Sequence, residues 1–282
     1  TFQVANYDRS SDGFVTTAFK DSNSVVKGTL YYGAYEGYVD DDDKLRSLSG
    51  KYGTDNSIPI TDLSSSRYWA NNNGDLYGIE DWCKRCYILG LLMLITKTRN
   101  LQAALGSGKV SDSLDNKIIS TGSLNKCGLF AGYRATETKG VKTFGIENLW
   151  GNCFSWCDGI ITLSSSTIGF KEHAPYNDTG EDYVEAYDGY NRDSDLCISK
   201  MNVILNGAAI FPSAGQSDPN IGWVDYAYIH SESRFSLVAC VGGCTSLDEK
   251  LSGPFMMRIN LDPITLENYA VGRLICLSTI TF

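Results

Sequence analysis

Histidine is nearly absent from the chain, and so are the short motifs that mark common catalytic sites. The only two histidines are His173 and His230, which excludes a three-histidine metal centre. A Cys–His nucleophilic pair would need a cysteine partner, and nothing in the sequence links one to either histidine. Glycine-rich phosphate loops, H-E-x-x-H and G-x-S-x-G are also missing. We therefore interpret both histidines as surface or hydrogen-bonded polar side chains.

Basic residues and long apolar runs are scarce too. The chain has 24 Lys and Arg against 33 Asp and Glu, for a net charge of -9, whereas a nucleic-acid binder carries a basic face. The longest strongly apolar run is Tyr87 to Ile95, whereas about 20 residues are needed to cross a bilayer. We expect neither a nucleic-acid partner nor membrane insertion. The sequence starts at Thr1 without a methionine or a signal peptide, which indicates a fragment or a processed chain.

Cysteine is present, but too thinly spread for a disulfide scaffold. Nine cysteines in 282 residues are an odd number, so at least one has no partner within the chain. Cys83 and Cys86 form a C-x-x-C pair inside a predicted helix, without the second pair that a zinc ribbon needs. Cys240 and Cys244 flank a double glycine, which favours close strand packing over a metal or a disulfide. We interpret most cysteines as buried apolar residues and expect no metal site.

Polar segments allow three weaker interpretations. The charge run Asp40 to Asp43 is typical of a solvated turn. The segment 182–195 loosely resembles a calcium loop, but its spacing does not match an EF-hand. Asn177 to Thr179 form a formal N-glycosylation sequon. None of these segments identifies a function by itself.

One segment, residues 77–100, has the strongest helical character. Glu80 and Asp81 lie near its start, and Lys97 and Arg99 lie near its end, which suits the helix dipole. Its centre is apolar on nearly every side, so we expect this helix to be buried. A second helix cap is predicted at Asp62, ahead of a polar turn.

The remaining pattern predicts short strands separated by polar turns. The chain has 28 Gly and 17 Tyr, with many Ser, Asn and Asp between short apolar runs, which is typical of a loop-rich α+β or mostly-β domain. We expect residues 1–40 to form an N-terminal strand segment, connected to an upstream stem, and 41–282 to form the main domain. The segment 101–140 is predicted to be loop-rich. Strands are expected within 13–19, 28–39, 159–163, 202–211, 235–243, 255–261 and 272–282.

The segment 145–159, GIENLWGNCFSWCDG, carries the most specific pattern in the chain. It resembles the signature G-[IL]-x-[ND]-[ML]-x-G-N-V-[WY]-E-W-x-x-D of the formylglycine-generating-enzyme-like branch of the C-type lectin fold. It departs from that signature at Cys153, Phe154 and Ser155. The matching positions are Gly145, Ile146, Asn148, Leu149, Gly151, Asn152, Trp156 and Asp158.

Two other segments agree with the family in order and spacing. Residues 77–89 share only Glu80 and Trp82 with a helix of the family. Residues 238–277 are similar to its closing pattern at Gly242, Gly243, Gly253, Phe255, Gly272, Arg273 and Leu274. The resemblance implies a C-type lectin-like fold with short twisted antiparallel sheets, one or two helices and long irregular loops. It also implies that the residues defining this fold are Gly145, Trp150, Gly151, Asn152, Trp156, Gly243, Gly272 and Arg273.

The family includes enzymes and non-enzymatic binding proteins. Its oxidases carry a cysteine pair after the closing double glycine, but here Cys244 takes a serine position and no cysteine follows until Cys276. Its iron-dependent branch uses a histidine triad, which this chain cannot supply. The remaining branch contains variable proteins diversified by retroelements, phage fibre tips and bacterial surface proteins.

The resemblance therefore predicts a non-enzymatic module without a cofactor. We expect a homotrimeric receptor-binding or head- or tail-fibre tip domain on a phage virion, which binds a glycan or a protein on the host-cell surface. Three alternatives stay open: a structural virion decoration protein, a bacterial surface adhesin, and an oxidase that uses Cys240 and Cys244 with copper.

The resemblance also implies where a ligand would bind. The closing segment Thr245 to Val271 would present side chains on an exposed face, and nearby tyrosines would add aromatic platforms at low entropic cost. The predicted ligand-binding residues are Ser246, Asp248, Glu249, Lys250, Asn260, Glu267, Asn268, Tyr269, Tyr226 and Tyr228.

Overall fold

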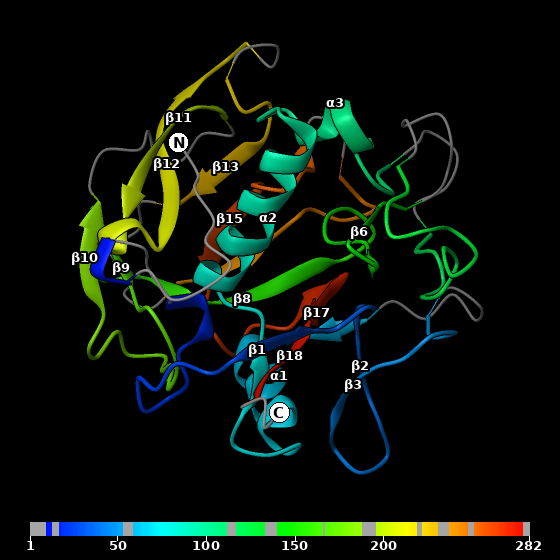
Figure 1. Cartoon of the computed structure of the whole chain (residues 1–282), viewed down its shortest axis with the longest axis horizontal. Coiled ribbons are helices and arrows are strands. Elements are labelled where there is room, and N and C mark those ends of the chain that lie inside the picture. Colours follow the sequence, from blue (N-terminus) through cyan, green and yellow to red (C-terminus); the bar gives the residue numbers. More distant parts are fainter. Residues whose placement is uncertain are drawn as a thin grey trace.

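The chain folds as a mixed α/β structure with many short strands and few helices (Figure 1). A computed structural model describes residues 10–12, 17–52, 59–111, 117–132, 140–165, 167–187, 196–218, 222–230, 237–247 and 251–278. Within these ranges there are three α-helices, one more than the sequence predicts at most, and five sheets. The third helix has only 5 residues.

The largest sheet has nine strands and curls around the core (Figure 1). The prediction of purely antiparallel sheets is wrong, because β13 pairs with β15 and β17 pairs with β8 in parallel. Strands that are far apart in sequence can pair in parallel only through long crossovers, which a local pattern does not reveal. In spatial order the strands are β10 (Val184–Tyr187), β9 (Ile168–Phe170), β8 (Phe154–Thr162), β14 (Val238–Val241), β15 (Met257–Leu261), β13 (Tyr226–Ile229), β11 (Leu196–Ile204) and β12 (Ala209–Gln216), with β17 (Ala270–Gly272) beside β8.

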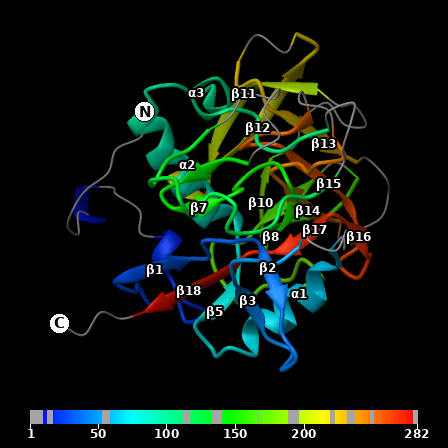
Figure 2. The same ribbon diagram turned by 90° about the vertical axis from the view of Figure 1, so that its right-hand side faces the viewer.

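Smaller sheets lie around this one. The three-stranded sheet β1–β18–β5 lies at the end of the molecule away from β11 and β12, as Figures 1 and 2 both show. Its strands are β1 (Thr29–Tyr32), β18 (Leu274–Ser278) and β5 (Tyr77–Ile79). The two-stranded sheets are β2 (Gly37–Val39) with β3 (Leu45–Ser47), β4 (Ile60–Thr61) with β16 (Glu267–Asn268), and β6 (Lys142–Thr143) with β7 (Ile146–Glu147).

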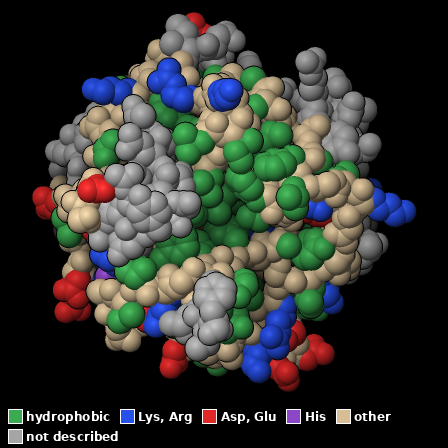
Figure 3. All heavy atoms as spheres, in the orientation of Figure 1, with side chains coloured by type: hydrophobic (Ala, Val, Ile, Leu, Met, Phe, Trp, Pro, Cys, Tyr) green, Lys and Arg blue, Asp and Glu red, His purple; other side chains and the backbone are tan. Residues whose placement is uncertain are grey.

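Helix α2 (Trp82–Thr96) covers one face of the large sheet. The predicted helix is confirmed, but it starts later than expected because the Asp81 carboxylate accepts a hydrogen bond from the Lys84 amide and caps it. The indole of Trp82 donates to the Ile210 carbonyl at 2.8 Å, which fixes the helix on β12. Figure 3 shows apolar side chains gathered in and around a hollow over and beside this helix.

The expectation that α2 is buried all round is wrong in its last turn. Leu94 is 41% and Ile95 is 57% exposed. The helix then ends at Lys97, which has a left-handed backbone conformation. Within the described part of the chain, no helix combines the length and the apolarity that a bilayer span requires.

Helix α1 (Leu63–Asn71) covers part of the opposite face of the sheet. Asp62 caps it as predicted, by accepting a hydrogen bond from the Ser65 amide at 2.7 Å. Leu63 and Ala70 pack into a second apolar cluster around Trp156. The large sheet is therefore covered by α2 on one face and partly by α1 on the other. Helix α3 (Leu101–Leu105) interrupts the segment that was predicted to be loop-rich.

The first strand expected from the sequence is partly replaced by a helix. Thr17–Phe19 form the 3-10 helix η2, whose Phe19 ring packs edge-on against Tyr87 at 5.2 Å, while residues 13–16 lie outside the described ranges. Residues 17–19 therefore pack against α2 as a 3-10 helix. An alternating apolar pattern cannot predict such a contact. The other 3-10 helices are η1 (Ser10–Asp12) and η3 (Leu205–Gly207).

The residues of the signature segment lie at the centre of the fold. Trp150 and Trp156 are both 0% exposed. Asn152 is also buried, and its carboxamide accepts from the Ile119 amide at 2.8 Å and donates to Glu36. Asn152 therefore satisfies polar groups where the chain path is irregular.

A buried ion network joins α2 to the closing segment. Glu80, Arg85 and Arg273 are all 0% exposed. The Arg85 guanidinium donates to Glu80, and the Arg273 guanidinium donates to the carbonyls of Glu147 and Asn148 at 2.9 and 2.8 Å. Glu80 therefore acts as a buried counter-ion rather than as a surface charge at the helix start.

Tight glycine turns let the signature segment pack closely. The φ angles are 84° at Gly145, 74° at Gly151 and 76° at Gly243. A Cβ atom on Gly151 would lie 2.8 Å from the Lys109 amide nitrogen, and one on Gly272 would lie 3.0 Å from the Ile79 side chain. Gly151 and Gly243 need glycine because a Cβ atom would meet neighbouring backbone, whereas Gly272 packs against side chains.

Replacing Gly151 with alanine should lower the free energy of unfolding by about 2–4 kcal/mol, because strain at positive φ adds to a clash with backbone. Gly50 is a matched control, since its φ is 78° but nothing lies within 4 Å of the added Cβ. Gly50→Ala should cost only about 1 kcal/mol. Urea denaturation measures both variants, and equal losses would show that packing against residue 109 does not constrain Gly151.

Candidate ligand-binding face

Strands β13 and β15 place alternate side chains on the two faces of the large sheet. Ala227, Ile229, Met257 and Ile259 point into the core cluster beneath α2. The intervening residues point to the opposite face and are half-buried: Tyr226, Tyr228, Arg258 and Asn260, with His230 following β13. We call these five residues the outer face.

The outer face and its border bring three predicted residues, Tyr228, Asn260 and Glu267, near one unpredicted residue, Arg258. Tyr228 lies directly beside Arg258 across the β13–β15 pair. The Arg258 guanidinium lies 3.5 Å from the Glu267 carboxylate, and these side chains keep 33% and 22% of their surface exposed. The Oδ1 atom of Asn260 is buried and has no hydrogen-bond partner among the described residues. The partly exposed Arg258–Glu267 ion pair therefore lies beside Tyr228. Asn260 follows on the same face of β15.

The aromatic part of the outer face is ordered by its own contacts. The rings of Tyr228 and His230 are stacked with an interplanar angle of 21° and a centroid separation of 6.1 Å. The Tyr228 hydroxyl lies 3.3 Å from Nδ1 of His230. Tyr226 lies opposite the fully buried Cys197 on β11, which supports the start of β13.

A buried carboxylate fixes the entry to both strands. Asp225 accepts hydrogen bonds from the Gln102 carboxamide at 2.7 Å and from the Phe255 amide at 2.9 Å. Gln102 also donates to the Ser252 carbonyl at 2.8 Å, so α3 holds the chain before β13 and before β15. Burial raises the pKa of Asp225 to about 7. This linkage holds the two strands that carry the outer face.

The segment after β15 borders the outer face. Glu267 and Asn268 form β16 and pair with Thr61 and Ile60 of β4. Tyr269 follows with a φ of 60°, and its carbonyl accepts from the Phe154 amide at 2.7 Å. Exposed apolar side chains gather at this edge of the fold: Ile60 at 50%, Ile264 at 76% and Leu266 at 64% exposure.

The remaining predicted ligand-binding residues are Ser246, Asp248, Glu249 and Lys250. Ser246 is exposed, and its hydroxyl lies 3.0 Å from the Cys244 sulfur. Asp248, Glu249 and Lys250 lie outside the described residues. The expectation of one exposed face over Thr245 to Val271 is too broad, because residues 252–257 and 270–271 are buried and β15 lies between two other strands.

No protein-family model matches this chain. No curated protein matches it either. The candidate face is therefore defined by its residues and geometry alone.

Cys240 lies beside Arg258 of the outer face across the β14–β15 pair, and both cysteine pairs are buried. Cys240 and Cys244 are both 0% exposed, and burial raises the pKa of both thiols. Cys83 and Cys86 are 1% and 2% exposed within α2. Across the described ranges, no three or more His, Cys, Asp or Glu side chains form a group that could hold a metal ion.

The sequon and the acidic segment take local structural roles where they are described. The Asn177 carboxamide accepts from the Gly180 amide at 2.9 Å and donates to the Glu181 carbonyl at 2.9 Å, which closes a turn. Asp182 is largely exposed and lies 3.9 Å from Lys171. Residues 188–195 lie outside the described ranges.

Sequence reasoning missed Arg258, His230, Gln102 and Asp225. The alternation in FMMRINL, residues 255–261, could have identified Arg258 as an outward residue of a strand. The linkage between Gln102 and Asp225 spans 123 positions and has no local signal.

Proposed function

We propose that the chain is a non-enzymatic ligand-binding module whose contact surface is the outer face. The observation that carries this proposal is the row of aromatic and planar polar side chains on two parallel strands, opposite the core. Tyrosine offers contact area at low entropic cost, while Arg, Asn and Glu add directional hydrogen bonds. Such a combination suits a glycan or a protein surface.

The support under the outer face favours recognition. Strands hold side chains more rigidly than loops do, and preorganised side chains lose less entropy on binding. The Arg258–Glu267 pair is partly exposed, so its hydrogen-bonding atoms are within reach of a ligand.

The biological setting that we propose rests on the family resemblance of the signature segment. In that setting the chain is a homotrimeric phage fibre tip, and its ligand is a glycan or a protein on the bacterial surface. The buried positions of Cys240 and Cys244 favour this binding role over oxidase chemistry, because a thiolate rather than a thiol binds copper and burial disfavours the thiolate.

The test is to replace Tyr226 and Tyr228 with alanine together and to measure binding to bacterial cells and to a glycan array. We expect the affinity to fall at least about tenfold, as for two aromatic contacts. Tyr68→Ala is the control, since Tyr68 is 58% exposed on α1, outside the outer face. Circular dichroism confirms that both variants are folded.

Two results would contradict the proposal. One is an unchanged affinity in the Tyr226→Ala/Tyr228→Ala variant. The other is the absence of binding to any cell surface or glycan together with copper-dependent turnover that is lost in Cys244→Ala. A virion in which the outer face is covered by neighbouring subunits would favour a decoration protein.

A further inference from the structure

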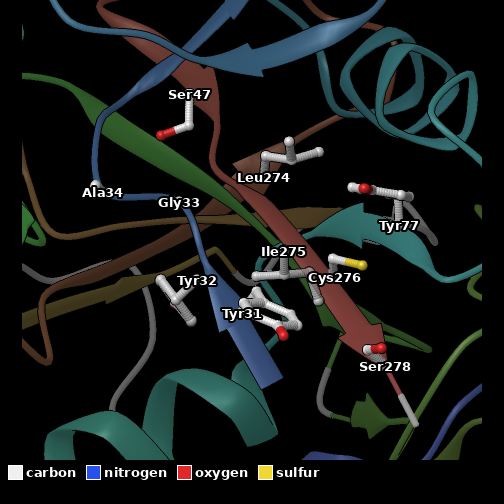
Figure 4. A pocket seen from close by; sticks show the side chains of 10 residues that line it. All are labelled: Tyr31, Tyr32, Gly33, Ala34, Ser47, Tyr77, Leu274, Ile275, Cys276 and Ser278. Atoms are coloured by element: carbon white, nitrogen blue, oxygen red, sulfur yellow. The ribbon is translucent and has the colours of Figure 1, made fainter. Parts of the chain in front are cut away.

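A groove of about 460 Å³ lies on the small sheet β1–β18–β5, away from the outer face (Figure 4). It runs along β18, with Tyr31 of β1 on one side and Tyr77 of β5 on the other. The other lining residues are Tyr32, Gly33, Ala34, Ser47, Leu274, Ile275, Cys276 and Ser278. Its volume is within the range of sites that bind small molecules.

Strand register aligns the main side chains of the groove. Tyr31 pairs with Cys276, and Cys276 pairs with Tyr77, so the three residues form one row across the sheet. Tyr31 is 57% and Tyr77 is 36% exposed. Adjacent strands lie about 4.8 Å apart, so the two tyrosine-bearing strands are separated by about 10 Å. The Tyr77 hydroxyl lies beside the Cys276 thiol, and the groove opens above this row of side chains.

The lining of the groove has a particular chemistry. None of its ten residues is charged, although the chain as a whole carries a net charge of -9. Three are tyrosines, and the hydroxyl groups of Ser47 and Ser278 stand at its two ends (Figure 4). Aromatic faces pack against apolar C–H surfaces, and hydroxyl groups exchange hydrogen bonds with other hydroxyls. A charged ligand would lose hydration without gaining a counter-ion from the lining, and the cation that acts on Tyr77, Arg46, lies outside the lining.

We propose that this groove is a second binding site, for a neutral sugar ring held between Tyr31 and Tyr77. The ring's C–H face packs on the tyrosines, and its hydroxyls reach the polar ends of the groove. The absence of charge in the lining selects neutral sugars over uronic or sialic acids. This site is separate from the outer face and does not depend on it.

Cys276 provides a direct readout, because it is half-buried in the floor of the groove. We would alkylate the full chain with iodoacetamide and follow each cysteine by mass spectrometry, with and without methyl glucoside, methyl galactoside, methyl mannoside or N-acetylglucosamine. A sugar at about ten times its Kd leaves about one chain in eleven free, so alkylation of Cys276 slows about tenfold. Cys127, the other half-buried cysteine, is the internal control and keeps its rate.

Variants locate the site. Tyr31→Ala and Tyr77→Ala should each abolish the protection of Cys276, whereas Tyr31→Phe and the exposed Tyr68→Ala should retain it. The Tyr226→Ala/Tyr228→Ala variant should also retain it, which separates this site from the outer face. Saturation-transfer NMR of the sugar signals gives a second readout that does not depend on thiol reactivity.

Several outcomes would overturn the proposal. One is that no neutral sugar protects Cys276 or shows saturation transfer. Another is that Cys127 is protected as strongly as Cys276. A third is that glucuronic acid protects Cys276 as well as the neutral sugars do. If Cys276 is alkylated faster when the protein is diluted in the absence of sugar, a second copy of the chain covers the groove. That result also excludes a sugar-binding role for the groove.

Discussion

Arg85→Ala should lower the free energy of unfolding by about 3–5 kcal/mol, the largest single effect that we expect. The Arg85 guanidinium donates to Glu80 and to the carbonyls of Leu149 and Pro254, at 2.9 and 2.8 Å. Alanine would leave these buried acceptors without that donor, and Arg273 is too distant to replace it, with its Nε atom 3.9 Å from Glu80. Urea denaturation measures the loss.

Two further variants make this result specific. Lys200→Ala removes an exposed cation from β11 and should change stability by less than about 0.5 kcal/mol. Glu80→Leu combined with Arg85→Leu also takes the Glu80 carboxylate away from the buried Arg273 guanidinium, 3.9 Å from it, and should cost at least as much as Arg85→Ala alone. If Arg85→Ala costs no more than Lys200→Ala, the network does not stabilise the fold.

Stability should fall as the pH rises from 5 to 8, by about 3–6 kcal/mol. Burial raises the pKa of Glu36 from 4.5 to about 7 and that of Asp225 from 3.8 to about 7. The folded state therefore holds these two protons more tightly than the unfolded chain does. The resulting stability is fully present below the unfolded pKa values, near pH 4, and is lost as the pH rises through the folded pKa values near 7.

Neither carboxyl group forms a close ion pair with a Lys or Arg among the described residues, so burial outweighs the weaker attraction of Arg273 for Glu36 and of Arg85 for Asp225. Glu36 accepts only from the carboxamides of Asn148 and Asn152 and from the Cys153 amide. Asp225 accepts from Gln102 and from the Phe255 amide. Amide donors only partly compensate for the loss of hydration of a buried negative charge.

The measurement is urea denaturation at several pH values. Glu36→Gln combined with Asp225→Asn should remove most of the fall between pH 5 and pH 8, even if it lowers stability overall by disturbing hydrogen bonds. Asp41→Asn, at an exposed turn, should leave the slope unchanged. A wild-type stability that is flat or rising over this range would contradict the assignment.

Local sequence patterns predict where helices and strands lie better than they predict which elements pair or pack together. Asp62 and Asp81 mark the starts of two helices in the sequence. This is possible because each caps its helix through the amide of a residue only three positions later. The same reasoning does not identify the partners of Arg85, which lies inside the buried helix. Its burial depends on Glu80 and on the Pro254 carbonyl, 169 positions later.

The candidate sites show the same limit. Tyr226 and Tyr228 are predicted only through the family resemblance. Local alternation could identify Arg258 as an outward strand residue, but its place beside Tyr228 depends on the parallel β13–β15 pairing. The groove is formed by strands that begin at residues 29, 77 and 274, so no local pattern could reveal it.

The β1–β18 pair also sets how the molecule responds to mechanical load. Thr29 at the start of β1 lies opposite Ser278 at the end of β18. Tension applied between these two residues therefore acts across the strands at one end of the pair, so its hydrogen bonds would be loaded one after another instead of together. Pulling along this axis peels the small sheet, and with it the groove, before the load reaches the nine-stranded sheet that carries the outer face.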